Sequence, residues 1–182
     1  MTTDKKKLPK FVPDVCGECT QTKTYDLGLD RGTAFIVLAV YNAVQRKDEN
    51  RVHIDKEMVA LKSDFDSLEH MISEGFMTSS MQHNVPRARY HGLIAFVDKG
   101  TGEYLLTPKG ARFLRGEAVP RIAIVDKKTH KKLAYWNEDE DQVTFRDLMK
   151  KTEPFWNLND QALAAISGGG WAGPTPQGAL AV

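Results

Sequence analysis

Residues 93–116 read LIAFVDKGTGEYLLTPKGARFLRG, and this stretch decides the fold more than any other part of the chain. Two short apolar runs, Ile94–Val97 and Tyr104–Leu106, flank the turn sequence Asp98–Gly102. The glycines of this turn tolerate positive φ, so the chain can reverse sharply between the two runs. The sequence therefore predicts a β-hairpin here.

A capped helix is predicted directly after the hairpin. Thr107 offers a hydroxyl at the N-cap, Pro108 occupies the first helical position, and Gly116 ends the helix. The apolar side of this helix consists of Ala111, Phe113 and Leu114. A hairpin that leads at once into a capped helix is the order of elements expected at the wing of a winged-helix domain.

The Gly92-Leu93-Ile94 segment and the segment Leu106-Thr107-Pro108-Lys109-Gly110 that leads to Phe113 resemble winged-helix domains of the bacterial regulator type. The chain is also similar to small proteins of bacteria and their viruses that join a Cys-x-x-Cys segment to such a domain. The resemblance covers roughly residues 29–116. It is more specific for fold than for function, because the same scaffold serves repressors, replication proteins and protein-interaction modules.

The fold class expected for the whole chain is α+β, with a winged helix-turn-helix core, an N-terminal extension and a C-terminal β-hairpin plus helix. The hairpin of this extension is predicted from Pro120–Val125 and Lys132–Trp136, and Thr144 can cap the helix that follows. From Pro154 onward only Asp160 is charged, and the Gly- and Pro-rich run Ser167–Pro176 cannot build a packed core, so the tail is expected to be disordered. Four segments are predicted: a leader over 1–28, the winged-helix domain over 29–117, the extension over 118–153 and the disordered tail over 154–182.

Within the core, Asp30 is a suitable N-cap for a central helix over Arg31–Lys47, whose apolar residues lie nearly all round. Two readings stay open for the segment that follows. Apolar spacing over Met58–Ile72 suits one continuous helix from Asp55 up to Gly75, whereas Ser63 and Asp66 resemble a capping box that starts a second helix after a break near Lys62. The break is the favoured reading.

The recognition helix departs from the family pattern. Pro86 removes a backbone donor, so the helix is predicted to begin near Asn84 or Val85 and to run only to Gly92. Two turns leave little room for reading base sequence in a groove.

Net charge is +1, yet cations gather in two stretches: Ser79–Gly116 holds six Lys/Arg against two Asp/Glu, and Val119–Trp136 holds five against one. Such segregation permits a local positive face for nucleic acid, although charged segments also commonly face water alone. The residues expected to contact double-stranded DNA are Arg87 and Arg89 on the short helix, Lys99 at the wing tip, and Lys109, Arg112 and Arg115 on the helix after the wing.

The predicted function is that of a small winged-helix DNA-binding protein, regulatory or accessory in a bacterium or a bacterial virus. The alternative is a protein-interaction module, such as a viral factor that binds a host protein, with contacts through the hairpin over 127–132 or through the C-terminal tail. A homodimer is a further option, through the leader or through the apolar stripe over Met58–Ile72.

Cys16 and Cys19 form the one motif in the sequence that is typical of metal binding, since two thiolates at this spacing can coordinate Zn²⁺. Zinc requires four ligands, however, and the chain has no other cysteine. The alternatives are a degenerate half-ribbon without zinc, a zinc site completed by histidines or by a second chain, and a redox or unrelated cysteine pair.

The sequence contains no P-loop, Gly-x-Ser-x-Gly, His-Glu-x-x-His or Gly-x-Gly-x-x-Gly motif in a suitable context, which favours a protein that is not an enzyme. No apolar run is long enough for a membrane span, and the basic N-terminus lacks the apolar stretch of a secretory signal. A cytoplasmic location without membrane contact is expected.

Overall fold

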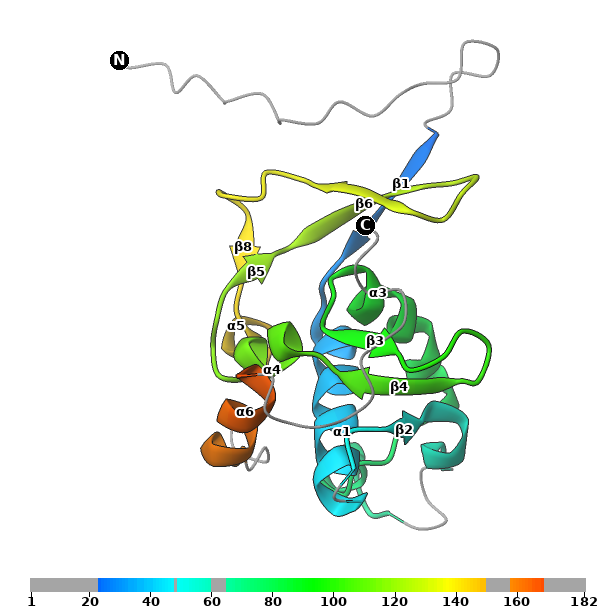
Figure 1. The fold of residues 1–182 in the computed structure, drawn as a ribbon, viewed down its shortest axis with the longest axis vertical. Helices are drawn as coiled ribbons and strands as arrows, with labels where there is room; N and C mark the ends of the chain where they lie inside the picture. The colour runs from blue at the N-terminus through cyan, green and yellow to red at the C-terminus, as the bar shows by residue number, and fades with distance from the viewer. Residues whose placement is uncertain (1–22, 48, 60–64, 150–157, 169–182) are drawn as a thin grey trace.

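The computed structural model describes residues 23–47, 49–59, 65–149 and 158–168. These residues form a mixed α and β fold around one long helix (Figure 1). Cys16 and Cys19 and most of the tail lie outside the described residues, so the alternatives for the cysteine pair stay predictions.

The central helix is α1 (Arg31–Lys47), as the sequence predicts. Asp30 begins it, because one carboxylate oxygen accepts hydrogen bonds from the Thr33 backbone N–H and from the Thr33 hydroxyl, both at 2.8 Å. At the other end, the buried Glu57 carboxylate accepts hydrogen bonds from Arg46 and Lys47. Both ends of α1 are therefore fixed by charged side chains.

Strands and short helices follow α1 in the order β2 (Val52–His53), η1 (Ile54–Glu57), α2 (Leu68–Ser73), η2 (Ser79–Asn84), α3 (Val85–Tyr90), β3 (Ile94–Phe96), β4 (Glu103–Leu106) and α4 (Pro108–Leu114). The predicted hairpin is confirmed as β3 and β4, which β2 joins in an antiparallel sheet of order β2-β4-β3. Thr107 caps α4 by accepting the Gly110 N–H at 2.9 Å, also as predicted.

One of the two readings left open after α1 is wrong. A continuous helix up to Gly75 does not form, because η1 ends at Glu57 and α2 begins only at Leu68. Ser67 caps α2 by accepting the His70 N–H at 3.1 Å. Ser63, the cap that the sequence predicts, lies outside the described residues.

The second sheet, here called the arm sheet, consists of β1 (Thr24–Gly28), β6 (Ile122–Asp126) and β7 (Lys132–Tyr135) in the order β1-β6-β7. The β6–β7 hairpin confirms the prediction for the extension. Residues 24–28, the end of the predicted leader, form a strand that pairs with β6 over its whole length. In Figure 1 the arm sheet lies at the end of the molecule nearest to α3.

The remaining elements are β5 (Val119–Pro120), β8 (Gln142–Val143), α5 (Phe145–Met149) and α6 (Asp160–Ser167). The prediction of disorder over 154–182 is wrong for residues 160–167. Asn159 caps α6 by accepting the backbone N–H groups of Gln161 and Ala162, and the helix buries Leu163 and Ile166. Burial of these two side chains stabilises α6 through tertiary packing, which the composition of the segment does not indicate.

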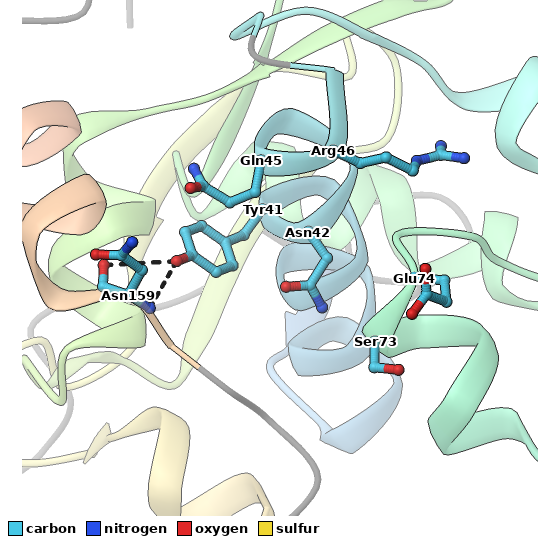
Figure 2. Close-up of a pocket in the computed structure, with 7 residues that line it drawn as sticks. All are labelled: Tyr41, Asn42, Gln45, Arg46, Ser73, Glu74 and Asn159. Atoms are coloured by element: carbon cyan, nitrogen blue, oxygen red, sulfur yellow. Dashed lines mark hydrogen bonds between the residues drawn. The ribbon is translucent and has the colours of Figure 1, made fainter.

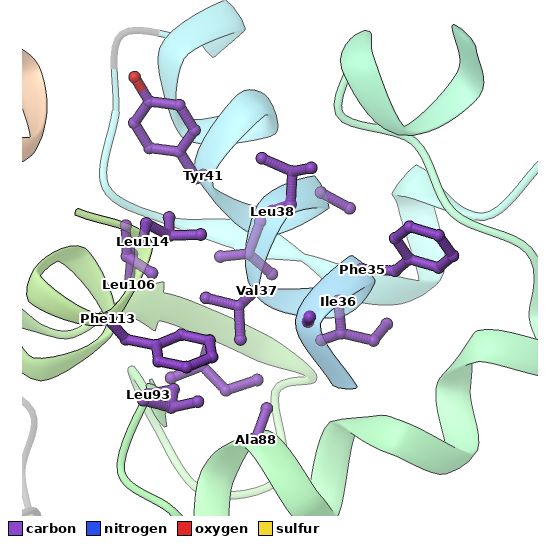
Figure 3. Packing of buried hydrophobic residues seen from close by; sticks show 14 of the residues in the cluster. Phe35, Ile36, Val37, Leu38, Tyr41, Ala88, Leu93, Leu106, Phe113 and Leu114 are labelled. Carbon is purple, nitrogen blue, oxygen red and sulfur yellow. The ribbon is translucent and has the colours of Figure 1, made fainter. Parts of the chain in front are cut away.

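The core is one continuous apolar cluster around α1. Figure 3 shows side chains of α1 packed against residues of α3, α4 and β4 and against Leu93, which directly precedes β3. The labelled side chains of this group are Phe35, Ile36, Val37, Leu38, Tyr41, Ala88, Leu93, Leu106, Phe113 and Leu114. The hairpin and α3 are thus anchored to the same helix, which fixes their relative position.

Candidate nucleic-acid interface

The two arginines of α3 have different surroundings. Arg87 donates a hydrogen bond to the Asp30 carboxylate and a second, at 3.2 Å, to the Asn84 side-chain oxygen. Because Asp30 also caps α1, Arg87 ties α3 to the start of the central helix. Its side chain is still 37% exposed, but its charge is already paired.

Arg89 lies over aromatic rings and has no carboxylate within ion-pair distance among the residues described. Its guanidinium carbon is 4.6 Å from the centre of the Tyr90 ring and 4.9 Å from that of Phe96. Phe96 in turn contacts Tyr104, its cross-strand partner, at 4.7 Å between ring centres. Arg89 therefore places an uncompensated positive charge beside the end of the β3–β4 hairpin nearest its turn.

Lys99 occupies the turn of the same hairpin and is exposed. Gly100 and Gly102 adopt φ values of 91° and 72°, which side chains with a Cβ rarely adopt. The Thr101 hydroxyl donates to the Asp98 carbonyl at 2.9 Å and closes the turn. In the described part of the chain, no acidic side chain forms an ion pair with Lys99.

The arm sheet contacts α3 through its hairpin turn. The Tyr90 hydroxyl donates to the His130 carbonyl at 2.7 Å, and the Tyr25 hydroxyl lies 3.4 Å from the His130 ring nitrogen Nδ1. Asp126 orders the turn by accepting the backbone N–H groups of Lys128 and Thr129. The turn consequently holds its exposed lysines beside the C-terminal end of α3.

These lysines, Lys127, Lys128 and Lys131, belong to the second cationic stretch of the sequence but are not among the residues predicted to contact DNA. In Figure 1 the turn of the β6–β7 hairpin and the turn of the β3–β4 hairpin project toward the same side of the view. The sequence gives little indication of this contact, because Tyr90 and His130 are forty residues apart and neither belongs to a motif.

The cations of α4 form a second group. Arg112 pairs with Glu117 at 2.9 Å, and Arg115 is exposed just after the helix. Lys109 points to the arm sheet instead, where its ammonium lies 3.2 Å from the Tyr135 hydroxyl. The structure therefore divides the predicted contact residues between α3 with the β3–β4 hairpin on one hand and α4 on the other.

His91 lies between these two groups and is fully buried. Its Nε2 is 2.9 Å from the Leu27 carbonyl of β1, so the neutral ring donates its proton there. Burial lowers the pKa of His91 from 6.5 to about 4, and the neighbouring Lys109 and Lys132 act in the same direction. His91 thus joins the core to the arm sheet as an uncharged side chain.

A polar cavity of about 450 Å³ lies between α1, α2 and the start of α6 (Figure 2). It is lined by Tyr41, Asn42, Gln45, Arg46, Ser73, Glu74 and Asn159. The Tyr41 hydroxyl accepts the Asn159 N–H at 2.8 Å, while the Ser73 hydroxyl donates to the His70 carbonyl at 2.7 Å. Because Ser73 contacts a carbonyl rather than a base, this set of lining residues does not form an activated nucleophile.

Within the described ranges, no group of three or more His, Cys, Asp or Glu side chains is placed to hold a metal ion. None of the helices there combines the length and apolar character needed to cross a bilayer. No known protein family, curated protein or solved structure matches the chain, so no residue role transfers to it from a relative.

Proposed function

We propose that residues 29–117 form a winged-helix domain that binds double-stranded DNA, and that the protein has a regulatory or accessory role. The order of helices and strands supports this: a central helix, a short strand, two further helices, a hairpin and a closing helix. In this arrangement α3 is the helix that faces DNA and the β3–β4 hairpin is the wing. The β6–β7 hairpin turn extends the same positive region.

The observation that carries the proposal is the pair of uncompensated cations on α3 and on the wing. Arg89 contacts Phe96, at the turn end of β3, and Lys99 lies in the turn itself. Phosphate oxygens would supply the negative charge that both side chains lack among their described neighbours. Arg87 is the weaker candidate because Asp30 already neutralises it.

Binding through these residues is expected to depend little on base sequence. α3 has six residues, a rise of roughly 9 Å, and Pro86 occupies its first turn. Contacts to the phosphate backbone position a protein on DNA but carry no sequence information. The expected activity is therefore salt-dependent binding with little base preference.

The test is a titration of a duplex of arbitrary sequence at two salt concentrations. The Arg89→Gln and Lys99→Gln double variant should bind at least about tenfold more weakly, and the slope of log affinity against log salt should fall by about two. Arg146→Gln, which removes an exposed charge from α5, is the matched control and should bind as the wild type does. Unchanged affinity of the folded double variant would overturn the assignment.

One feature favours the alternative of a protein-interaction module. Leu133, on the edge strand β7, is 50% exposed and is the large apolar side chain that stands out on the described surface. An edge strand with an exposed leucine can pair with a strand of another protein. Binding of this kind would be nearly independent of salt, so the same titration separates the two functions.

A further inference from the structure

Two lysines converge on a single hydroxyl where α4 meets the arm sheet. Lys109 extends from the first turn of α4, and Lys132 begins β7. Each ammonium nitrogen lies 3.2 Å from the Tyr135 hydroxyl oxygen. The same nitrogens lie 5.0 Å and 4.3 Å from the centre of the Tyr135 ring.

Tyr135 is itself fixed in place. Its hydroxyl donates to the His91 carbonyl at 3.3 Å, and its ring contacts the His91 ring at 5.6 Å between centres. The hydroxyl oxygen accepts from both ammonium groups, so two like charges are held side by side. Each side chain is about half-buried, which reduces the screening that water would provide.

The pair lacks a matching negative charge. Among the residues that the structure describes, no carboxylate lies within ion-pair distance of Lys109 or Lys132. Glu138 and Glu117 act on the pair only at longer range, and Arg112, which Glu117 neutralises, adds a further positive charge. Burial lowers the pKa of both lysines, and the proximity of Lys132 lowers the pKa of Lys109 further.

We propose that Lys109, Lys132 and Tyr135 form a binding site for one phosphate group, and that this group belongs to the backbone of the bound DNA. The second part of this inference rests on the proposed function. Ammonium groups donate charge-assisted hydrogen bonds to phosphate oxygens, and a phosphate placed between them would replace their mutual repulsion with two attractions. The tyrosine hydroxyl acts as the spacer that keeps both donors in position.

Such a site would give the arm sheet a function. Its hairpin turn contacts α3, and Tyr135 contacts α4, so the sheet bridges the two cationic groups of the core. A DNA phosphate backbone that runs from the wing past α3 would then reach the lysine pair where the arm sheet contacts α4. Lys132 thereby becomes a contact residue that the sequence analysis did not single out for DNA.

The first experiment measures the pKa of both lysines in the intact wild-type chain by NMR of the side-chain Cε nuclei. Both values are expected below the ordinary lysine value in the free protein, and saturating inorganic phosphate should raise them. The duplex used above should raise them as well. Because no substitution is involved, a folding defect cannot imitate or hide this result. If neither probe shifts the two lysines, the inference is overturned.

The second experiment uses variants. Lys132→Gln should weaken phosphate binding about tenfold, Lys132→Arg should largely restore it, and Arg146→Gln should leave it unchanged. Glu138→Gln removes the carboxylate whose charge acts on both lysines and should tighten phosphate binding about threefold. A purely structural role of the pair would not respond to Glu138→Gln in this direction, so its failure to tighten binding counts against the site.

The two proposals can fail separately. If Arg89→Gln with Lys99→Gln abolishes duplex binding while Lys132→Gln leaves both the affinity and the salt slope unchanged, DNA binding stands and the backbone contact is overturned. If phosphate shifts both lysines but the wild-type chain binds no duplex, the proposed function fails. The site then holds free phosphate or a small phosphate ester, and the claim that the phosphate belongs to a DNA backbone is overturned.

Discussion

His91 illustrates how one buried ionisable residue couples two parts of the molecule. Its ring donates to the Leu27 carbonyl of β1, and its backbone carbonyl accepts from the Tyr135 hydroxyl of β7. Both edge strands of the arm sheet therefore meet the core at this residue. Lys109 and Lys132 lie near enough to oppose a positive charge on the ring, so protonation of His91 would be costly in the folded state.

We expect stability to fall as the pH falls from 6.5 to 4. The pKa of His91 is about 4 in the folded protein and near its ordinary value of 6.5 in the unfolded chain. The unfolded chain therefore binds the extra proton in this window, and the contribution of the neutral ring, about 3 kcal/mol, is present above pH 6.5 and lost by pH 4. Urea unfolding at pH 7.5 and 4.5 measures this loss.

His91→Gln is the control for this pH dependence. Glutamine can donate to the Leu27 carbonyl but does not titrate in this range, so the variant should lose less stability between the two pH values than the wild type does. An equal loss in both proteins would show that another group is responsible.

At the scale of elements, α4 depends on a very close approach between backbones. A Cβ added to Gly110 would lie 2.1 Å from the Leu93 carbonyl oxygen, at the entrance to β3. That contact allows the Thr107 cap and the hairpin to sit directly against the helix. Only glycine fits there, because the neighbouring atom belongs to the main chain and cannot rotate away.

Gly110→Ala is therefore expected to lower the free energy of unfolding by about 2–4 kcal/mol. Gly28→Ala is the matched control, because an added Cβ at Gly28 meets nothing within 4 Å, and its effect should stay within about 0.5 kcal/mol. Chemical unfolding of both variants measures the difference. Equal effects would mean that α4 can shift away from Leu93 at no cost.

Elements with local signals could be predicted from the sequence. Asp30, Thr107 and Pro108 act through neighbours within one helical turn, so α1 and α4 were found with their caps. The turn glycines made the β3–β4 hairpin predictable in the same way. Asn159 carries a comparable cap signal for α6, but the surrounding low-charge composition concealed it.

Features that depend on distant partners could not be predicted. β1 is five residues long and becomes a strand only because β6 offers a pairing edge. The ion pair of Arg87 with Asp30 and the convergence of Lys109 and Lys132 on Tyr135 join residues far apart in the chain. Sequence spacing therefore identified cations as a class but did not separate the paired ones from the uncompensated ones.

At the scale of the whole molecule, α6 belongs to the same apolar cluster as α1, α4 and α5. Leu163 and Ile166 are its buried side chains, and the helix follows a segment outside the described residues. The contact means that residues 160–167 contribute to the stability of the core.

Leu163→Ala should reduce the free energy of unfolding by about 2–5 kcal/mol and should accelerate exchange of the buried amides of α1. Gln161→Ala, at an exposed position of the same helix, should change stability by no more than about 0.5 kcal/mol. Hydrogen exchange read at α1 measures the coupling. Faster exchange confined to α6 would mean that this helix unfolds on its own.

β1 pairs with β6, which lies about a hundred residues later in the chain, and this separation affects folding during translation. β1 is made about 5–20 s before its partner at ordinary elongation rates, while α1 and α4 are completed in between. The nascent chain can therefore begin to pack its central helix against α4 and the β3–β4 hairpin before the N-terminal strand has its partner. Translation that stalls before β6 would leave that strand without an edge to join, so its backbone N–H and C=O groups would stay unpaired.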